Sequence, residues 1–467
     1  MKERLQIKPR ILETLHALRR YGVEKGYEFS LFYHEEISTL MRFANSAISL
    51  NTNEHLIRIN ITAYEGRKRA DYELITDLSK LDEMKHSIDI AAEMVKHAQP
   101  LNYDPTVPTL VESFADDSGY EPKLAGISNE ERLAYFNNAA KGLETDDIKL
   151  SGIFSNGSNT VAHINTRSEH TQYFRTSDAQ VTAVLSHAKL KWEVIAEQSA
   201  QKKSELDASA LRREFAFLLD RYQKDEALQL PIGSYDIVFG SAATGDLLSV
   251  MNWIGFSGGS MKRGFSFVGE DQVGKKVFSD KFTLVDDPTR LETFPFKRDL
   301  TGIVRKPFPI FENGVFKSFT WFQDDADEFG AKATGHTVMH KSLVLSGGDG
   351  AANSLEELVK QPREKDILYI PFLHYMNIVN PSKGVITASS RFGALLLRKD
   401  GSVAVPYNVR ITQSLLDLFG DKVSWMSNSQ AVNNTSMSYG ARNPTAVIVP
   451  RFVKVDDIEI SHSNSSY

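Results

Sequence analysis

A strict alternation of apolar and polar side chains over residues 56–64 constrains the fold more than any other feature of this sequence. The apolar positions are Ile57, Ile59, Ile61 and Ala63, each followed by a polar or amphipathic residue. Side chains on a strand point alternately to opposite faces, so this pattern predicts a strand with one buried face. A sheet built from such strands needs a layer of other elements on its apolar face.

Helical patterns on both sides of this strand predict that layer. Ile11, Leu15 and Leu18 recur at helical spacing, and residues 81–97 return to the same period. Ser128-Asn-Glu-Glu131 has the form of a capping box, in which a serine hydroxyl and a glutamate carboxylate satisfy the first backbone N–H groups of a helix. The first half is therefore predicted to be helices on an antiparallel sheet.

The region 150–189 reads as a meander of short strands. Turn-forming residues at 155–158 (Ser-Asn-Gly-Ser) and 176–178 (Thr-Ser-Asp) predict breaks between them. Residues 197–230 are polar and helix-prone, with an apolar face formed by Leu211, Phe215, Leu218 and Leu219. We place a domain boundary after this helix, which gives an N-terminal α+β domain over 1–228 and a β-rich domain over 229–467.

The second half is predicted to be rich in strands. A strand over 235–239 leads into a helix with Thr244 as its expected cap. Asn313-Gly314 and Asp400-Gly401 each lie between apolar runs, which is the signature of tight hairpins. The predicted fold class is therefore α+β, a helix-on-antiparallel-sheet domain followed by a strand-rich domain.

Charge and cysteine content exclude several kinds of function. The formal net charge is −6, which opposes direct binding to nucleic acid. The 467 residues include no cysteine, so disulfides, thiolate nucleophiles and cysteine metal ligands are excluded, and a reducing cytoplasm is the expected location. No apolar run is long enough to span a membrane, and no export signal is recognised at the start.

Two histidines and two aspartates are the weak candidates for chemistry. His336 and His340 are four residues apart, but Thr337 and Val338 favour a strand, on which they would lie about 13 Å apart. Ordinary hydrogen-bonded histidines are the favoured interpretation. Asp286 and Asp287 could bind a cation or carry out acid–base chemistry, although a turn before Pro288 is favoured.

The glycines of the segment Gly255-Phe-Ser-Gly-Gly259 follow the predicted helix without a phosphate-binding motif. They predict a sharp turn or a close approach to another chain.

An ordered series of short motifs resembles the TldD/PmbA family, whose members were once named modulators of DNA gyrase and are regarded as peptidases and peptidase partners. The series includes Gly264-Phe-Ser-Phe-Val-Gly269, Phe282-Thr-Leu-Val-Asp-Asp-Pro288, Ala333-Thr-Gly335, Leu343-Val-Leu-Ser-Gly347 and Ser354-Leu-Glu-Glu-Leu358. The order and spacing of the motifs, rather than any one of them, carry a resemblance that extends over essentially the whole chain.

The resemblance implies that this chain lacks the family's metal site. Catalytic members carry H-E-x-x-x-H and a later cysteine, and these positions correspond here to Ser249, Val250, Ile254 and, near the end of the chain, Ser427. A catalytic zinc needs about three protein donors, which these residues do not supply. The chain is thus similar to the PmbA branch and is expected to be noncatalytic alone, with no cofactor of its own.

Because this chain lacks the metal site, the resemblance also implies a partner. We expect a hetero- or homodimer, with a TldD-like metallopeptidase subunit holding the zinc and an extended peptide as substrate. Gly255, Gly258 and Gly259 would then shape a loop beside the peptide path. Two alternatives stay open: a metallopeptidase in its own right that uses His336, His340, Asp286 or Asp287, and a modulator of DNA gyrase that acts through a protein partner.

Overall fold

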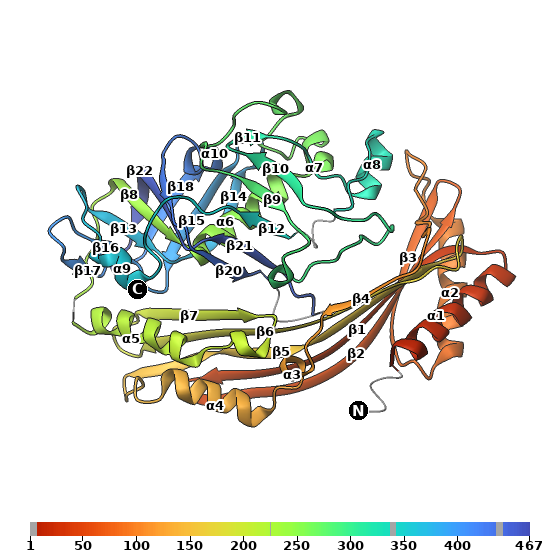
Figure 1. The fold of residues 1–467 in the computed structure, drawn as a ribbon, viewed down its shortest axis with the longest axis horizontal. Coiled ribbons are helices and arrows are strands. Elements are labelled where there is room, and N and C mark those ends of the chain that lie inside the picture. Colours follow the sequence, from red (N-terminus) through yellow and green to blue (C-terminus); the bar gives the residue numbers. More distant parts are fainter. Residues whose placement is uncertain (1–6, 225, 337–341, 436–441) are drawn as a thin grey trace.

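The N-terminal half of the chain is built on one long, curved sheet (Figure 1). The computed structural model describes residues 7–224, 226–336, 342–435 and 442–467. The sheet has seven strands in the order β3-β2-β1-β5-β6-β4, and β7 also pairs with β6. Its strands are β1 (Glu28–Ala44), β2 (Ala47–Glu65), β3 (Lys68–Thr76), β4 (Phe114–Gly119), β5 (Ile148–Asn165), β6 (Gln172–His187) and β7 (Glu193–Ala200).

The alternation over residues 56–64 lies within β2 and confirms the predicted half-buried strand. Ile57, Ile59, Ile61 and Ala63 are at most 4% exposed, and they pack beneath two helices. These are α1 (Ile7–Glu24) and α2 (Leu81–His97), and the second has the predicted bounds. Ile11, Leu15 and Leu18 of α1 are completely buried, as the helical spacing requires.

The predicted breaks in the meander at 155–158 and 176–178 are wrong. β5 and β6 run through both segments and pair with each other from Ile148 to His163 without interruption. These segments contain buried polar side chains whose partners lie on other elements, namely Ser155, Asn156, Ser177 and Asp178. Asn156, for example, accepts a hydrogen bond from Arg132 at 2.7 Å and donates to the carbonyl oxygens of Leu124 and Ala125.

The other end of the sheet is covered by a second group of helices. They are α3 (Pro122–Ala125), α4 (Asn129–Ala140) and α5 (Ala208–Lys224). The predicted capping box is present at the start of α4, where the Ser128 hydroxyl accepts from Glu131 N–H and the Glu131 carboxylate accepts from Ser128 N–H. The predicted apolar face of α5 is buried at Leu211, Phe215, Leu218 and Leu219.

The C-terminal half contains two further sheets. The six-stranded sheet has the order β11-β10-β9-β12-β21-β20, and the nine-stranded sheet has the order β14-β15-β18-β22-β8-β13-β16-β17 with β19 beside β22. The strands of the six-stranded sheet are β9 (Leu284–Asp286), β10 (Phe308–Glu312), β11 (Val315–Phe316), β12 (Leu343–Leu345), β20 (Gln430–Asn434) and β21 (Ala446–Pro450). Those of the nine-stranded sheet are β8 (Gly233–Gly240), β13 (Ile367–Ile370), β14 (Phe372–Asn380), β15 (Val385–Arg391), β16 (Leu395–Leu397), β17 (Val403–Ala404), β18 (Val409–Ser414), β19 (Val423–Met426) and β22 (Phe452–Ser463).

One helix, α6 (Ser241–Gly255), joins the two C-terminal sheets. It contacts β20 and β21 of one sheet and β8, β14 and β22 of the other. Shorter helices complete this half: α7 (Gly258–Lys262), α8 (Gln323–Phe329), α9 (Leu355–Lys360) and α10 (Leu415–Leu418).

Both predicted hairpins are confirmed, whereas the predicted cap at Thr244 is wrong. Asn313-Gly314 joins β10 to β11 with positive φ at both residues, and Asp400-Gly401 lies between the paired strands β16 and β17. The helix α6 begins at Ser241, so Thr244 lies inside it and is completely buried. The α+β fold class is confirmed.

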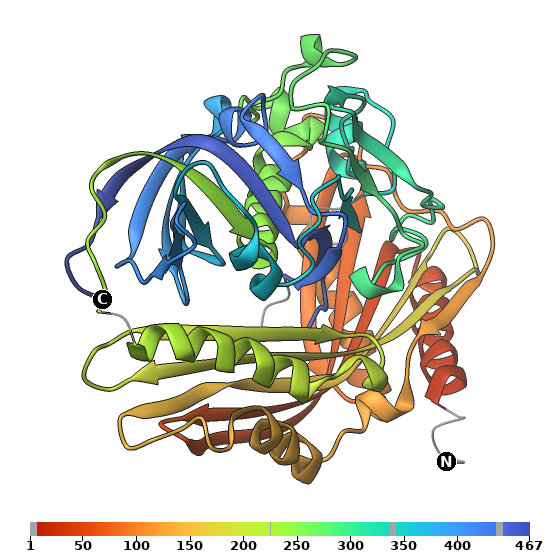
Figure 2. The ribbon, with the colours of Figure 1, turned by 60° about the vertical axis from the view of Figure 1, so that its left-hand side comes forward.

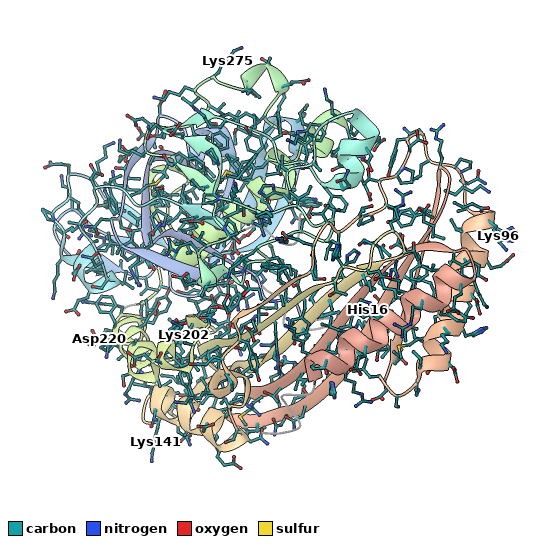
Figure 3. All side chains as sticks on the ribbon, turned by 45° about the vertical axis from the view of Figure 1, so that its right-hand side comes forward. His16, Lys96, Lys141, Lys202, Asp220 and Lys275 are labelled. Carbon is teal, nitrogen blue, oxygen red and sulfur yellow. The ribbon has the colours of Figure 1, made fainter. Side chains whose placement is uncertain are left out.

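The C-terminal half lies over the face of the long sheet opposite to α1 and α2 (Figures 1 and 2). Side chains fill the space between the two halves, while His16 on α1 lies on the outer side (Figure 3). One buried cluster contains residues of both halves, including Phe215 of α5 and Tyr369 of β13. The domain boundary at 228/229 stays a prediction.

Candidate functional site

The side chains of α6 at the implied metal positions are engaged in the fold. The Ser249 hydroxyl donates a hydrogen bond to the Gly245 carbonyl oxygen of the same helix at 2.9 Å. Ile254 is 4% exposed in the C-terminal core, and Val250 packs against that core. Two of these three side chains are hydrocarbon, and the serine hydroxyl is already bonded to its own helix.

The hydroxyl of Ser427, the fourth implied position, also forms hydrogen bonds within the protein. Ser427 is completely buried just after β19, where its hydroxyl donates to Ser429 O at 2.8 Å and accepts from Phe452 N–H at 3.1 Å. Among the residues that the structure describes, no three His, Cys, Asp or Glu side chains form a group that could hold a metal ion. The residues present here therefore do not fit the catalytic zinc of the family.

The glycines that follow α6 allow close packing. A Cβ atom at Gly258 would lie 2.2 Å from the Trp321 ring, and one at Gly259 would lie 2.1 Å from the Asp325 carboxylate. A Cβ at Gly255 would meet the Phe267 ring at 2.5 Å. These contacts lie within this chain, and a larger residue at any of the three positions would force the neighbouring side chain to move. A role beside a peptide path stays a prediction.

Asp286 and His336 meet in a buried ionic cluster that sequence reasoning did not foresee. His336 Nε2 lies 2.6 Å from Asp286 Oδ2, and Arg305 Nη2 contacts both carboxylate oxygens at 2.8 and 2.6 Å. The Ser342 N–H donates to the same carboxylate. Burial alone would raise the pKa of Asp286, but the hydrogen bond from His336 and the charge of Arg305 hold it at about 2. Both oxygens of this carboxylate are thus already bound within the protein.

The Asp287 side chain forms a local turn instead. Its carboxylate accepts from the N–H and hydroxyl of Thr289, which is the turn favoured from the sequence before Pro288. His340 lies outside the described residues. The structure therefore brings together His336 and Asp286 but gives Asp287 a local structural contact, and the catalytic use of these residues stays a prediction.

Three carboxylates on different elements interact electrostatically, because Glu197 of β7 acts on both Asp246 of α6 and Glu214 of α5. Asp246 of α6, Glu197 of β7 and Glu214 of α5 each have a pKa raised to about 7. Desolvation by the surrounding protein is the main cause for each, and the charge of Glu197 adds to it for Asp246 and for Glu214. Glu197 and Glu214 are exposed to solvent, which screens their charges and weakens the shift in their pKa, whereas Asp246 is half-buried. We call these three residues the acidic group.

One sequence signal could have identified the acidic group. Asp246 is the only charged residue in α6, a helix of 15 residues whose remaining side chains are apolar or neutral. A single charge in such a helix marks either a solvent-facing position or a functional group. Glu197 and Glu214 carry no comparable signal, because each has other charged residues in its segment and only the tertiary fold brings Glu197 near Asp246 and near Glu214.

A buried ion pair between Arg442 and Asp178 joins the two halves. Arg442 Nε and Nη2 donate to Asp178 Oδ1 and Oδ2 of β6 at 2.8 and 2.6 Å. The Arg442 backbone N–H donates to Glu36 Oε2 of β1 at 2.6 Å, and Arg58 Nη1 reaches the same oxygen at 2.8 Å. Asp178 and Glu36 are completely buried. The polar residues expected to form turns in β5 and β6 instead form part of this interface.

The strand β20 is an edge strand of the six-stranded sheet and lies beside α6. A Cβ atom at Gly245 would lie 2.1 Å from Asn433 Nδ2, which shows how closely helix and strand approach. Arg451 N–H donates to Ser429 O, and Thr435 N–H donates to Thr445 O, both at 2.9 Å. Bonded pairs recur every second residue of an antiparallel ladder, so the Val432 N–H points away from β21. No strand of the described ranges pairs with this outer edge of β20.

The C-terminal half of the chain matches a known protein family. Residues 232–462 match the family model described as the PmbA/TldA metallopeptidase C-terminal domain. No curated protein matches the sequence. None of the helices in the described part of the chain combines the length and apolar character needed to cross a membrane.

Solved structures share the fold over nearly the whole chain. TldE from Thermococcus kodakarensis aligns with a TM-score of 0.79 at 18% identity, covering 96% of this chain and 100% of its own. A candidate modulator of a DNA gyrase from Thermotoga maritima aligns at 0.74 with 16% identity, covering 96% and 99%. A similar candidate modulator from Bacteroides thetaiotaomicron aligns at 0.74 with 14% identity, covering 96% and 98%.

Proposed function

Residues 232–462 belong to the PmbA/TldD metallopeptidase family, and from this premise we propose that the chain is a noncatalytic subunit that helps a zinc metallopeptidase partner to bind and process extended peptides. The state of α6 carries this proposal. Ser249 bonds to its own helix, Ile254 lies in the core and Ser427 holds the start of β22. A water molecule cannot be activated by zinc without about three donors at such positions.

The edge of β20 is the surface that we assign to peptide binding. Extended peptides bind to a free sheet edge through backbone hydrogen bonds, which give affinity with modest dependence on sequence. The Val432 N–H faces this edge, and α6 lies directly beside the strand. Asp246 of α6 and Glu197 of β7 interact electrostatically, and both α6 and β7 contact β20. A peptide bound here would run between the two halves of the molecule.

The partner in this proposal is a TldD-type subunit that carries H-E-x-x-x-H on the helix corresponding to α6. Such a subunit would hold the only zinc of a heterodimer and perform the cleavage. This chain would contribute binding surface to the same peptide. The cytoplasm is the compartment we propose, because a chain without cysteine loses nothing in a reducing environment.

Cleavage assays on purified proteins test the proposal. Unstructured peptides are incubated with this chain alone, with the TldD-type subunit alone and with both together. We expect no cleavage by this chain alone and faster cleavage by the pair than by the TldD-type subunit alone. Zinc-dependent cleavage by this chain alone would overturn the noncatalytic assignment. An unchanged rate in the pair would overturn the role as a partner.

A further inference from the structure

A cavity of about 630 Å³ lies where the β6–β7 hairpin meets the nine-stranded sheet. Its wall includes Lys191 and Glu193 from the hairpin, with His374, Arg391, Arg410 and His462 from strands of the C-terminal half. The volume is typical of sites for small organic molecules. None of these residues belongs to α6, to the acidic group or to β20.

The charges of this cavity do not cancel within the described structure. Arg391 pairs with Glu193, whose Oε2 lies 2.8 Å from Nε and 2.7 Å from Nη2. Arg410 Nη1 donates to the Thr387 hydroxyl at 3.1 Å and has no ion-pair partner among the described residues. Lys191 likewise forms no ion pair within the ranges that the structure describes. One carboxylate thus faces three permanent cations, which leaves an excess of positive charge.

The backbone around the cavity departs from regular strand geometry at a β-bulge and at two residues with positive φ. The pairing of β14 with β15 shifts register between His374 and Asn377, which is a bulge that includes Tyr375. Tyr375 and Phe392 have φ of 50° and 63°, a left-handed conformation that is costly for aromatic residues. The bulge leaves Tyr375 68% exposed, with its ring 4.1 Å from the His374 ring centre.

We propose that this cavity binds a small organic anion through a carboxylate or phosphate group. The planar guanidinium of Arg410 presents a fork of N–H donors that can bond two oxygens of either group, and Lys191 adds a second positive charge. The aromatic rings of Tyr375 and Phe392 offer an apolar surface for the remainder of the ligand. The bulge and the two left-handed aromatic residues form the wall that the ligand contacts. This site is independent of the proposed role as a peptidase partner.

Calorimetric titration with two probes tests the site and separates the two kinds of ligand. The full-length protein is titrated with inorganic phosphate and, separately, with succinate. We expect saturable binding of at least one probe with one site per chain, and the probe that binds identifies the anionic group. Arg410→Gln should weaken this binding by about tenfold or more, because a hydrogen bond to a charged group is lost.

Arg213→Gln is the matched control, because Arg213 is an exposed arginine on α5 outside the cavity. It should bind the probe as the native protein does. For succinate, whose carbon chain would contact the ring, Tyr375→Gly provides a second variant. It relieves the positive φ, so its melting temperature should not fall while its affinity for succinate does. The proposal is overturned if neither probe binds saturably, or if Arg410→Gln and Arg213→Gln bind alike.

Discussion

Asp246 shows how the surrounding fold changes the chemistry of a single residue. Burial, together with the charge of Glu197, raises its pKa from 3.8 to about 7. The protein tolerates this group at the accessible face of α6, beside the strand edge to which we assign the peptide. A carboxyl that is costly to ionise and lies next to an assigned binding surface is often functional rather than structural.

Asp246→Asn is expected to stabilise the protein at high pH. The folded state holds a proton that the unfolded chain releases, so the cost of Asp246 develops as pH rises from about 4 and is complete above about 7. The variant should be more stable than the native protein by on the order of 2 kcal/mol at about pH 8, and equal to it near pH 4. Urea unfolding at the two pH values measures both differences.

Asp220→Asn serves as the control for this experiment. Asp220 lies on the exposed side of α5, and its hydrogen bond with Lys224 lowers its pKa. This variant should gain no stability at high pH. A gain for Asp246→Asn that is the same at both pH values would show that ionisation of Asp246 is not its cause.

At the scale of elements, β20 is the strand on which the peptide proposal depends. Its Val432 N–H points away from β21, so Val432→Pro removes an outward donor without removing a bond of the β20–β21 ladder. We expect this variant to lose about tenfold or more in affinity for an extended peptide, as measured by fluorescence anisotropy. Val432→Ala is the control, since it trims the side chain and keeps the N–H. Equal peptide affinity of the two variants would argue against binding at this edge.

Elements with regular periodicity were predictable from the sequence, and the interface between the halves was not. The alternation in β2 and the helical face of α5 depend on local spacing, so residues such as Ile59 and Phe215 identify their own burial. Asn156 and Asp178 resemble turn residues in sequence. Their partners Arg132 and Arg442 lie 24 and 264 residues away, and only the tertiary fold brings them together.

The candidate site likewise combines features that local sequence identifies with contacts that only the tertiary fold creates. The resemblance carried by the ordered motifs implies metal positions on α6. The lack of metal donors there could be inferred from the sequence, because the side chains of Ser249 and Ile254 are unsuitable whatever their surroundings. The ionic cluster of Asp286, Arg305 and His336 could not, since its members are separated by 19 and 50 residues and lie on different segments. Asp246 was visible as a single charge in an apolar helix, but Glu197 and Glu214 were not.

At the scale of the whole molecule, Arg442 is expected to hold the two halves together. Replacing it by methionine would leave the buried carboxylates of Asp178 and Glu36 with fewer donors. Removing one partner of a buried pair typically costs about 3–5 kcal/mol, so Arg442→Met should lower the free energy of unfolding by that order. Urea unfolding measures the change.

A double variant separates the ion pair from simple packing. Arg442→Met combined with Asp178→Asn should regain much of the lost stability, because the uncompensated charge is gone. If the two substitutions instead have additive costs, the Arg442–Asp178 pair does not couple the halves.

The zinc content of the complex with a TldD-type subunit tests the central claim most directly. Metal analysis of the purified pair should find one zinc per pair, and replacing the first histidine of the partner's H-E-x-x-x-H by alanine should remove it. The same preparation should keep its two subunits associated, because in our proposal this chain supplies no ligand to the zinc. Zinc that stays with this chain in stoichiometric amount after that substitution would contradict the account.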